Sequence, residues 1–163
     1  GKLVGFLESG YPTVVGDGSS TVAELVTAMN ASRAAGVAEV ILTDSHVGYI
    51  KRRGYALDSV LPENVELPLT YRAGYGQGGW NREYGHAIHP SFIPIIEEAA
   101  RLTGLSVVGF DLVIPEAEAS ADSQRWGFIE ANSLPWIDLH AAPFYGDPID
   151  VAPFVWDMWK SAA

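Results

Sequence analysis

Three polar side chains near the C-terminal end of the chain have the types and spacing of a metal site. The segment GFIEAN (127–132) begins as an apolar strand and then places Glu130 and Asn132 two residues apart. Because side chains alternate along a strand, these two share one face. An earlier apolar run, GFDLVIP (109–115), contains Asp111. If the two runs pair as a hairpin, Asp111 can lie beside Glu130 or Asn132, which gathers two carboxylates and one amide oxygen.

This combination of ligands favours a hard divalent cation. Converging carboxylates in apolar surroundings are costly unless a cation neutralises them. Oxygen ligands suit Mg²⁺ or Mn²⁺, with water and ligand phosphates completing the coordination. The pattern therefore predicts a Mg²⁺ or Mn²⁺ site formed by Asp111, Glu130 and Asn132. The alternative is that the two carboxylates lie at strand ends and face solvent, as charged residues commonly do at sheet edges.

The elements that must position these side chains indicate an α+β fold. The runs 105–115 and 125–132 predict two strands joined by a polar, acidic loop, which favours an antiparallel sheet with helices packed around it. Helical spacing of apolar residues follows a Gly-Asp-Gly turn, with Ser20 or Thr21 as N-cap. The other predicted elements are a first strand at 2–9 and helices at 43–52, 90–103 and 148–160.

Composition limits the class of partner. With 163 residues, the chain is long enough for one domain with a real core. Ten basic and twenty acidic residues give a net charge of −10, which argues against nucleic acid and anionic membranes as partners. The sequence contains no cysteine, which excludes disulfides and zinc–sulfur sites and suits a cytoplasmic protein. The chain begins at Gly1 within a strand-like run, so we expect a piece of a longer protein.

Several ordered motifs together resemble the C-terminal part of an ATP-grasp domain, most like those of cyanophycin synthetases and then of bifunctional glutathione synthetases. The resemblance covers nearly the whole chain. Its motifs, in chain order, are PTVVGDGSSTVAELV, GYALDSVLPENVELPL, the Gly78-Gly79 pair, IHP at 88–90, FDLVIPE and GFIEANSLPWIDLHAAPFYGDP.

The resemblance implies an ATP-dependent carboxylate–amine ligase that forms an amide bond through an acyl phosphate. It implies ATP and Mg²⁺ (or Mn²⁺) as cofactors, with Asp111, Glu130 and Asn132 as the metal ligands. Its partners would be a nucleotide and an amino-acid or peptide-like substrate. Residues 1–163 would form a single partial domain whose first lobe lies upstream, supplied by a longer chain or a second copy. Within it, residues 1–35 would end a lid-like lobe and residues 60–163 would form the metal and phosphate-binding lobe.

Other residues have two open readings. Arg72, in RAGYGQGG, is a candidate catalytic and cofactor-binding residue because a guanidinium suits phosphate oxygens, or it is a solvated loop residue. Gly78 and Gly79 are candidate cofactor-binding positions that allow close approach of the backbone to a phosphate. His140 either shapes an acceptor site or is a capping or surface residue, and RRG at 52–54 predicts a helix C-terminus.

The alternative to a ligase is a non-catalytic ATP-grasp module that serves binding or assembly. The predicted loss of the first lobe favours this alternative. The presence of all three candidate metal ligands favours a portion of a working enzyme, although we expect the isolated chain to be inactive.

Overall fold

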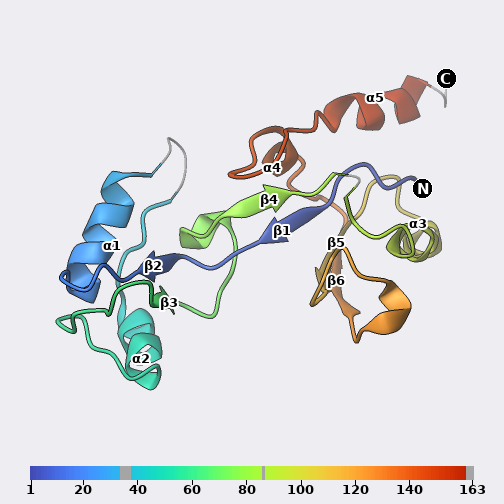
Figure 1. The fold of residues 1–163 in the computed structure, drawn as a ribbon. Coiled ribbons are helices and arrows are strands. Elements are labelled where there is room, and N and C mark those ends of the chain that lie inside the picture. Colours follow the sequence, from blue (N-terminus) through green and yellow to red (C-terminus); the bar gives the residue numbers. More distant parts are fainter. Residues whose placement is uncertain (34–37, 86, 161–163) are drawn as a thin grey trace. The chain divides into compact units, whose positions relative to one another are not determined.

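The chain folds into two compact units. The computed structural model describes residues 1–163 except 34–37, 86 and 161–163. Unit 1 contains Gly1–Glu8 and Arg82–Ala163, and unit 2 contains Ser9–Asn81 (Figure 1). Both boundaries fall within strands, one after Glu8 in β1 (Leu7–Ser9) and the other after Asn81 in β4 (Asn81–Glu83). These two strands neighbour each other in a two-stranded sheet.

The predicted α+β class with antiparallel strands is confirmed, and every sheet among the described residues has two strands. The strand pairs are β1–β4, β2–β3 and β5–β6. Unit 2 contains β2 (Thr13–Val15), α1 (Val22–Ala31), α2 (Asp44–Arg52), β3 (Glu66–Pro68) and the 3₁₀ turn η1 (Tyr75–Gln77). Unit 1 contains α3 (Phe92–Thr103), β5 (Gly109–Val113), the 3₁₀ turn η2 (Ala121–Ser123), β6 (Gly127–Asn132), α4 (Asp138–Ala141) and α5 (Ala152–Lys160).

The first predicted strand, 2–9, was wrong in its length, since only Leu7–Ser9 is extended and paired. Two of the preceding backbone N–H groups donate to side chains instead of to a neighbouring strand. The Leu3 N–H donates to Glu97 Oε1 over 3.0 Å, and the Phe6 N–H donates to Glu83 Oε1 over 3.1 Å. A strand cannot continue where its ladder donors are already used in this way.

The predicted Gly-Asp-Gly turn leads into α1 through two layers of capping. Asp17 Oδ1 accepts hydrogen bonds from the N–H groups of Ser19 and Ser20, and Asp17 Oδ2 accepts one from the Ser20 hydroxyl. Thr21 then forms a capping box with Glu24, in which each side chain accepts from the backbone N–H of the other. Hydrogen bonds to the charged form, first from the Ser20 hydroxyl, hold the pKa of Asp17 well below its usual range.

The core of unit 2 joins both of its helices to the β2–β3 sheet. The sheet is antiparallel, with Val14 opposite Leu67. Helix α1 buries one face and α2 buries Ile50 near its end. The buried cluster consists of Val14, Val22, Val26, Val40, Ile50, Leu61, Leu67 and Leu69.

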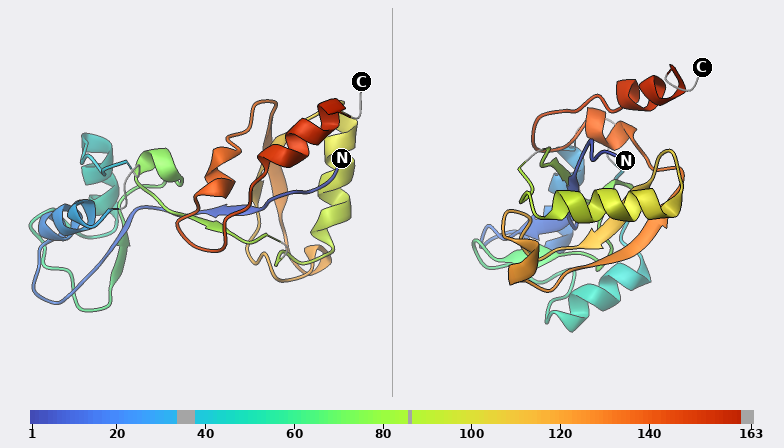
Figure 2. Two further views of the ribbon diagram at one scale, coloured as in Figure 1. Left: turned by 90° about the horizontal axis from the view of Figure 1, so that it is seen from above. Right: turned by 90° about the vertical axis from the view of Figure 1, so that its right-hand side faces the viewer.

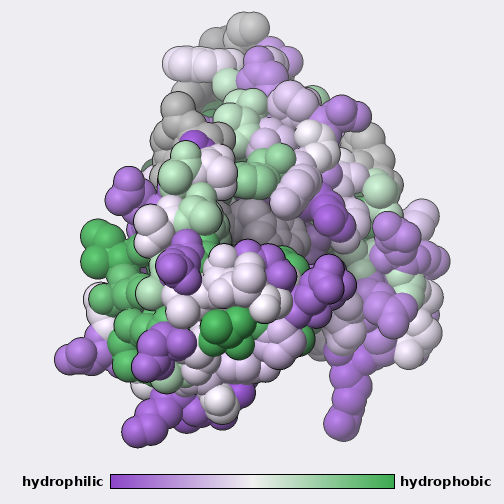
Figure 3. All heavy atoms as spheres, turned by 60° about the vertical axis from the view of Figure 1, so that its left-hand side comes forward, coloured by the Kyte–Doolittle hydropathy of each residue, from purple (hydrophilic) through white to green (hydrophobic). Residues whose placement is uncertain are grey.

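Not all hydrophobic residues are buried in these cores. Figure 3 shows a face of the molecule on which hydrophobic residues (green) gather at the surface among hydrophilic ones (purple).

The core of unit 1 lies between α3 and the β5–β6 sheet (Figure 2). Phe92 and Ile96 of α3 are buried against Phe110, and the Phe92 and Trp126 rings meet edge to face with centroids 5.0 Å apart. Such aromatic pairs stabilise beyond the area that they bury. Helix α3 ends as predicted, with Gly104 in the left-handed conformation at φ 68°.

A buried carboxylate links four segments of unit 1. The Glu83 side chain is 1% exposed. Its Oε1 atom accepts hydrogen bonds from the N–H groups of Phe6 and Gly85, at 3.1 and 2.8 Å. Its Oε2 atom lies 2.5 Å from His140 Nδ1, which donates in the tautomer that carries hydrogen there. A β-carbon on Gly5 would lie 2.5 Å from the His140 ring, so only glycine fits beside this pair.

No described helix has the length and apolar character needed to cross a membrane.

The Asp17 turn generates a prediction about pH. Because the folded-state pKa of Asp17 is lowered, its contribution to stability is present above the unfolded pKa of about 4 and is lost as pH falls toward the folded-state pKa. We expect Asp17→Ala to lower the melting temperature at pH 7, and the difference from the unaltered chain to shrink as pH falls below about 4. Calorimetry between pH 2 and 7 measures this difference.

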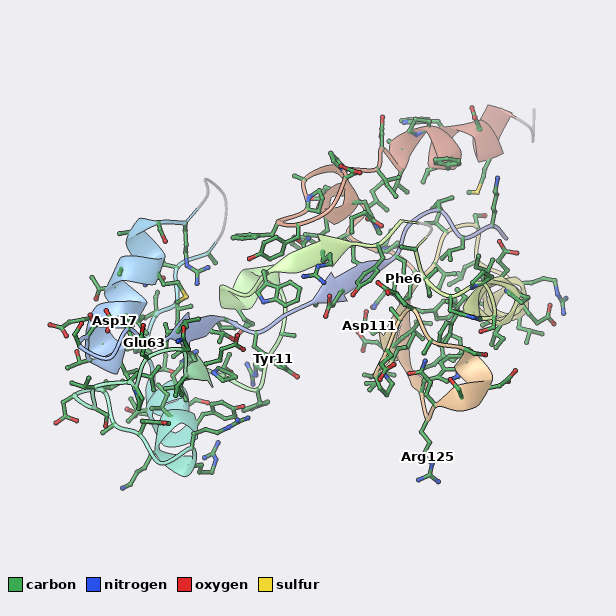
Figure 4. The ribbon with its side chains drawn as sticks, viewed as in Figure 1. Phe6, Tyr11, Asp17, Glu63, Asp111 and Arg125 are labelled. Atoms are coloured by element: carbon green, nitrogen blue, oxygen red, sulfur yellow. The ribbon has the colours of Figure 1, made fainter. Side chains whose placement is uncertain are left out.

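Glu63→Ala is the matched control, since it removes another exposed carboxylate of unit 2 (Figure 4). A difference for Asp17→Ala that stays constant over the whole pH range would contradict the role given to the Asp17 charge.

Candidate metal-binding site

The β5–β6 hairpin brings the three candidate metal ligands together. The strands are antiparallel, with Asp111 opposite Glu130 and Gly109 opposite Asn132. The Asn132 Nδ2 group donates to Glu130 Oε1 over 3.1 Å. Asp111 (labelled in Figure 4) and Glu130 are exposed and Asn132 is half-buried, so the group is open to solvent and to ligands.

A β-bulge at Ile129 makes this arrangement possible. Asp111 pairs with Glu130, whereas the next residue, Leu112, pairs with Phe128, so Ile129 has no partner. In a regular strand Phe128 and Glu130 would share one face. Here Phe128 contacts the Phe110 ring on the core side, with centroids 5.1 Å apart, while Glu130 meets Asp111, whose neighbour in the strand is Phe110. The bulge therefore turns Glu130 away from the core side, an effect typical of bulges near functional sites.

The electrostatics of the pair favour a cation. Partial burial raises the pKa of Asp111, and a hydrogen bond and the negative charge from Glu130 raise this pKa further. A raised pKa means that ionising Asp111 next to Glu130 is unfavourable. A divalent cation between the two carboxylates would remove this repulsion, because it favours the charged form of both groups.

The donor set fits Mg²⁺ or Mn²⁺ that also binds water or phosphate. No described residues form a group of three or more His, Cys, Asp or Glu side chains that could hold a metal. The hairpin offers two carboxylates and, since Asn132 Nδ2 donates to Glu130, the Asn132 Oδ1 atom. Mg²⁺ prefers six oxygen ligands and commonly takes only one or two carboxylates, with the rest supplied by water and substrate phosphates. The residues present therefore match a metal bridging to a phosphate.

Arg72, Gly78 and Gly79 belong to unit 2, whereas the candidate metal ligands belong to unit 1. Arg72 is exposed, and its guanidinium carbon lies 5.7 Å from the centre of the Tyr71 ring. Gly78 and Gly79 are buried within unit 2. A β-carbon on Gly79 would lie 2.1 Å from the Gly10 carbonyl oxygen, so packing already requires glycine there. A role of these three residues in binding a cofactor stays a prediction.

Sequence reasoning missed Glu83 and left the role of His140 open. A lone glutamate in WNREYG has no signal that separates it from a surface residue, because its burial depends on segments far away in the sequence. The structure shows the His140 side chain 18% exposed and in contact with Glu83. Because His140 lies in α4, which follows β6, this contact holds the segment that comes after the candidate metal ligands.

Comparison with known proteins links this chain to a group of enzymes. No protein-family model matches the sequence. A cyanophycin synthetase from Synechocystis sp. is 32% identical over 164 residues, which cover 97% of this chain and 19% of that protein. A bifunctional protein of glutathione biosynthesis from Clostridium perfringens is 26% identical over 152 residues, which cover 90% of this chain and 20% of that protein.

The fold agrees with these sequence matches. The crystal structure of a bifunctional glutathione synthetase from Pasteurella multocida superposes with a TM-score of 0.77 and 25% identity, covering 99% of this chain and 23% of that one. The chain is a homologue of part of these ATP-grasp enzymes. The ATP-grasp resemblance seen in the sequence is thereby confirmed, and the chain spans about a fifth of the length of the curated relatives it matches.

The bulge generates a prediction about the metal site of this ATP-grasp homologue. Deleting Ile129 removes the unpaired residue, so Phe128 stays opposite Leu112 and Glu130 stays opposite Asp111. We expect the deletion to change Mn²⁺ binding less than two-fold, measured by the paramagnetic broadening of backbone amide signals in β5 and β6.

Deleting Ala131 is the contrasting variant, because Asn132 would then follow Glu130 directly and turn to the side of Phe110. We expect this variant to bind Mn²⁺ more weakly, and equal Mn²⁺ binding in the two deletion variants would contradict the register given to the ligands.

Proposed function

We propose that the chain supplies the metal and phosphate-binding part of an ATP-dependent ligase that joins a carboxylate to an amine. The observation that supports this proposal best is the meeting of Asp111, Glu130 and Asn132 on one face of the β5–β6 hairpin. The relatives named as synthetases support the same class of reaction. Because the chain spans only about a fifth of those relatives, the activity and the substrates of the whole protein are part of the proposal.

The proposed reaction has two chemical steps. The substrate carboxylate attacks the γ-phosphorus of ATP, ADP leaves, and an acyl phosphate forms. The amine then attacks the acyl carbon, inorganic phosphate leaves, and the amide bond forms with loss of a proton from nitrogen. Both steps require the negative charge of the phosphoryl oxygens to be neutralised and the reacting groups to be aligned.

The residues of the hairpin meet the first requirement. Asp111 and Glu130 would hold Mg²⁺ by their carboxylates, and Asn132 would add a neutral oxygen. The bound ion supplies charge stabilisation to the phosphates. The Glu83–His140 contact and the bulge hold the hairpin and its following segment in place, so that the ligands need little rearrangement.

Arg72, which lies in unit 2, is a separate candidate for binding a phosphate. Its guanidinium is exposed, and among the described residues it takes part in no ion pair, since the ion pairs found there involve Arg82, Arg101 and His140. A planar guanidinium can bind two phosphoryl oxygens at once.

The competing function is a module that binds nucleotide without catalysis, or binds no nucleotide at all.

Thermal denaturation of this chain tests the binding half of the proposal. A ligand at about 100 times its dissociation constant stabilises the folded state by roughly 2.7 kcal/mol. We expect a rise in melting temperature with Mg²⁺ and ATP together that exceeds the rises with either alone, and we expect Glu130→Gln to remove it. Absence of a joint effect in the unaltered chain would contradict a metal–phosphate site within these residues.

Substitution in the complete enzyme tests the catalytic half. We expect Glu130→Gln or Asn132→Ala to lower turnover by roughly 100-fold or more, because each removes an oxygen that holds the charge-stabilising metal. Excess Mn²⁺ should restore part of the loss.

Asp122→Asn, which neutralises another exposed carboxylate of unit 1, should retain full activity. Turnover in Glu130→Gln within a factor of two of the unaltered enzyme would contradict the metal assignment.

A further inference from the structure

Basic side chains are concentrated at the end of α2 in an otherwise acidic chain. Lys51, Arg52 and Arg53 are consecutive and exposed. Together with Arg72 they make four of the ten basic residues, while the whole chain has a net charge of −10. The positive charge of unit 2 is therefore local and is available to a ligand of limited size.

Two tyrosines bring the three arginines of this group, Arg52, Arg53 and Arg72, into one surface. The guanidinium carbons of Arg52 and Arg53 lie 5.7 and 5.2 Å from the centre of the Tyr49 ring. The Arg53 Nη2 group also donates to the Tyr49 hydroxyl over 2.8 Å. The Tyr49 and Tyr71 rings are 6.2 Å apart, and Arg72 lies 5.7 Å from the Tyr71 ring. We call these five residues the arginine–tyrosine cluster.

The helix terminus alone does not account for this cluster. Cations at the end of α2 complement the negative end of the helix dipole, which explains why Arg52 and Arg53 are tolerated there. The dipole does not explain why Tyr71 and Arg72, from a segment about twenty residues later, meet the same group. Two separate segments therefore contribute cations and rings to one surface.

The guanidinium groups keep hydrogen-bonding capacity for an external anion. Within the described part of the chain, the ion pairs involve Arg82, Arg101 and His140, and none of the three cluster arginines. A guanidinium near a ring is attracted through its positive charge, and its five N–H donors suit carboxylates in a forked geometry. Contact with tyrosine also limits the freedom of each arginine, so less entropy is lost when a carboxylate binds.

The size and charge of the cluster favour a short acidic peptide. In an extended peptide successive residues are about 3.3–3.6 Å apart, so two or three carboxylates fit within reach of three guanidinium groups. A nucleic acid or an anionic membrane would extend beyond the cluster over a protein with a net charge of −10 and would be repelled.

We propose that the arginine–tyrosine cluster binds an acidic peptide segment of another polypeptide through carboxylate–guanidinium hydrogen bonds. This proposal shares only Arg72 with the proposed ligase function, and its test leaves Arg72 in place, because Arg52 and Arg53 have no part in the metal site.

A fluorescently labelled ten-residue glutamate peptide tests the proposal by anisotropy with this 163-residue chain at low salt. We expect saturable binding that weakens at least 10-fold in the double variant Arg52→Gln/Arg53→Gln, with Arg72 left in place. The control is Arg101→Gln/Arg125→Gln, which removes the same charge from exposed residues of unit 1 (Arg125 is labelled in Figure 4) and should change the affinity less than two-fold.

Three outcomes would overturn the proposal. The peptide fails to bind the unaltered chain, or the two double variants weaken binding equally, which would make the effect one of net charge only. Alternatively, a ten-nucleotide single-stranded DNA binds more tightly than the peptide, which would assign the surface to nucleic acid.

Discussion

The carboxylate of Glu83 is the interaction on which the arrangement of unit 1 depends. A buried charge is tolerated only when hydrogen bonds replace its lost hydration, and Glu83 accepts from two backbone N–H groups and lies next to His140 Nδ1. Because those donors come from the N-terminal segment, the turn after β4 and α4, the charge ties these segments together. Losing any one donor leaves part of a buried charge unsatisfied, so the whole junction forms or fails as a unit.

The arrangement of the three candidate metal ligands follows from this framework and from one irregularity in β6. Helix α3 packs on the core side of the β5–β6 hairpin, which leaves the other side for the polar ligands. The bulge at Ile129 then transfers Glu130 and Asn132 to that free side beside Asp111. The raised pKa of Asp111 shows that the arrangement is electrostatically unfavourable by itself, as expected where the protein holds a group ready for a cation.

The sequence predicted the hairpin and the sharing of a face by Glu130 and Asn132, because apolar runs and alternation are local signals. It did not predict the bulge, since one unpaired residue leaves no trace in hydrophobic spacing. It also did not reveal Glu83 or the meeting of Tyr71 with Tyr49, which depend on contacts between distant segments. The first strand was predicted too long because side-chain acceptors for the N–H groups of Leu3 and Phe6 could not be foreseen.

The two boundaries between the units had no sequence signal, because each falls inside a strand. Their positions show how unit 2 is connected to unit 1 along the chain. The chain leaves unit 1 after Glu8 and returns at Arg82, and the strands at these points, β1 and β4, neighbour each other in one sheet. Unit 2 is therefore inserted in the chain between two neighbouring strands. Replacing it with a short turn would join strands that already pair, so unit 1 could be obtained as a continuous minidomain without new backbone geometry.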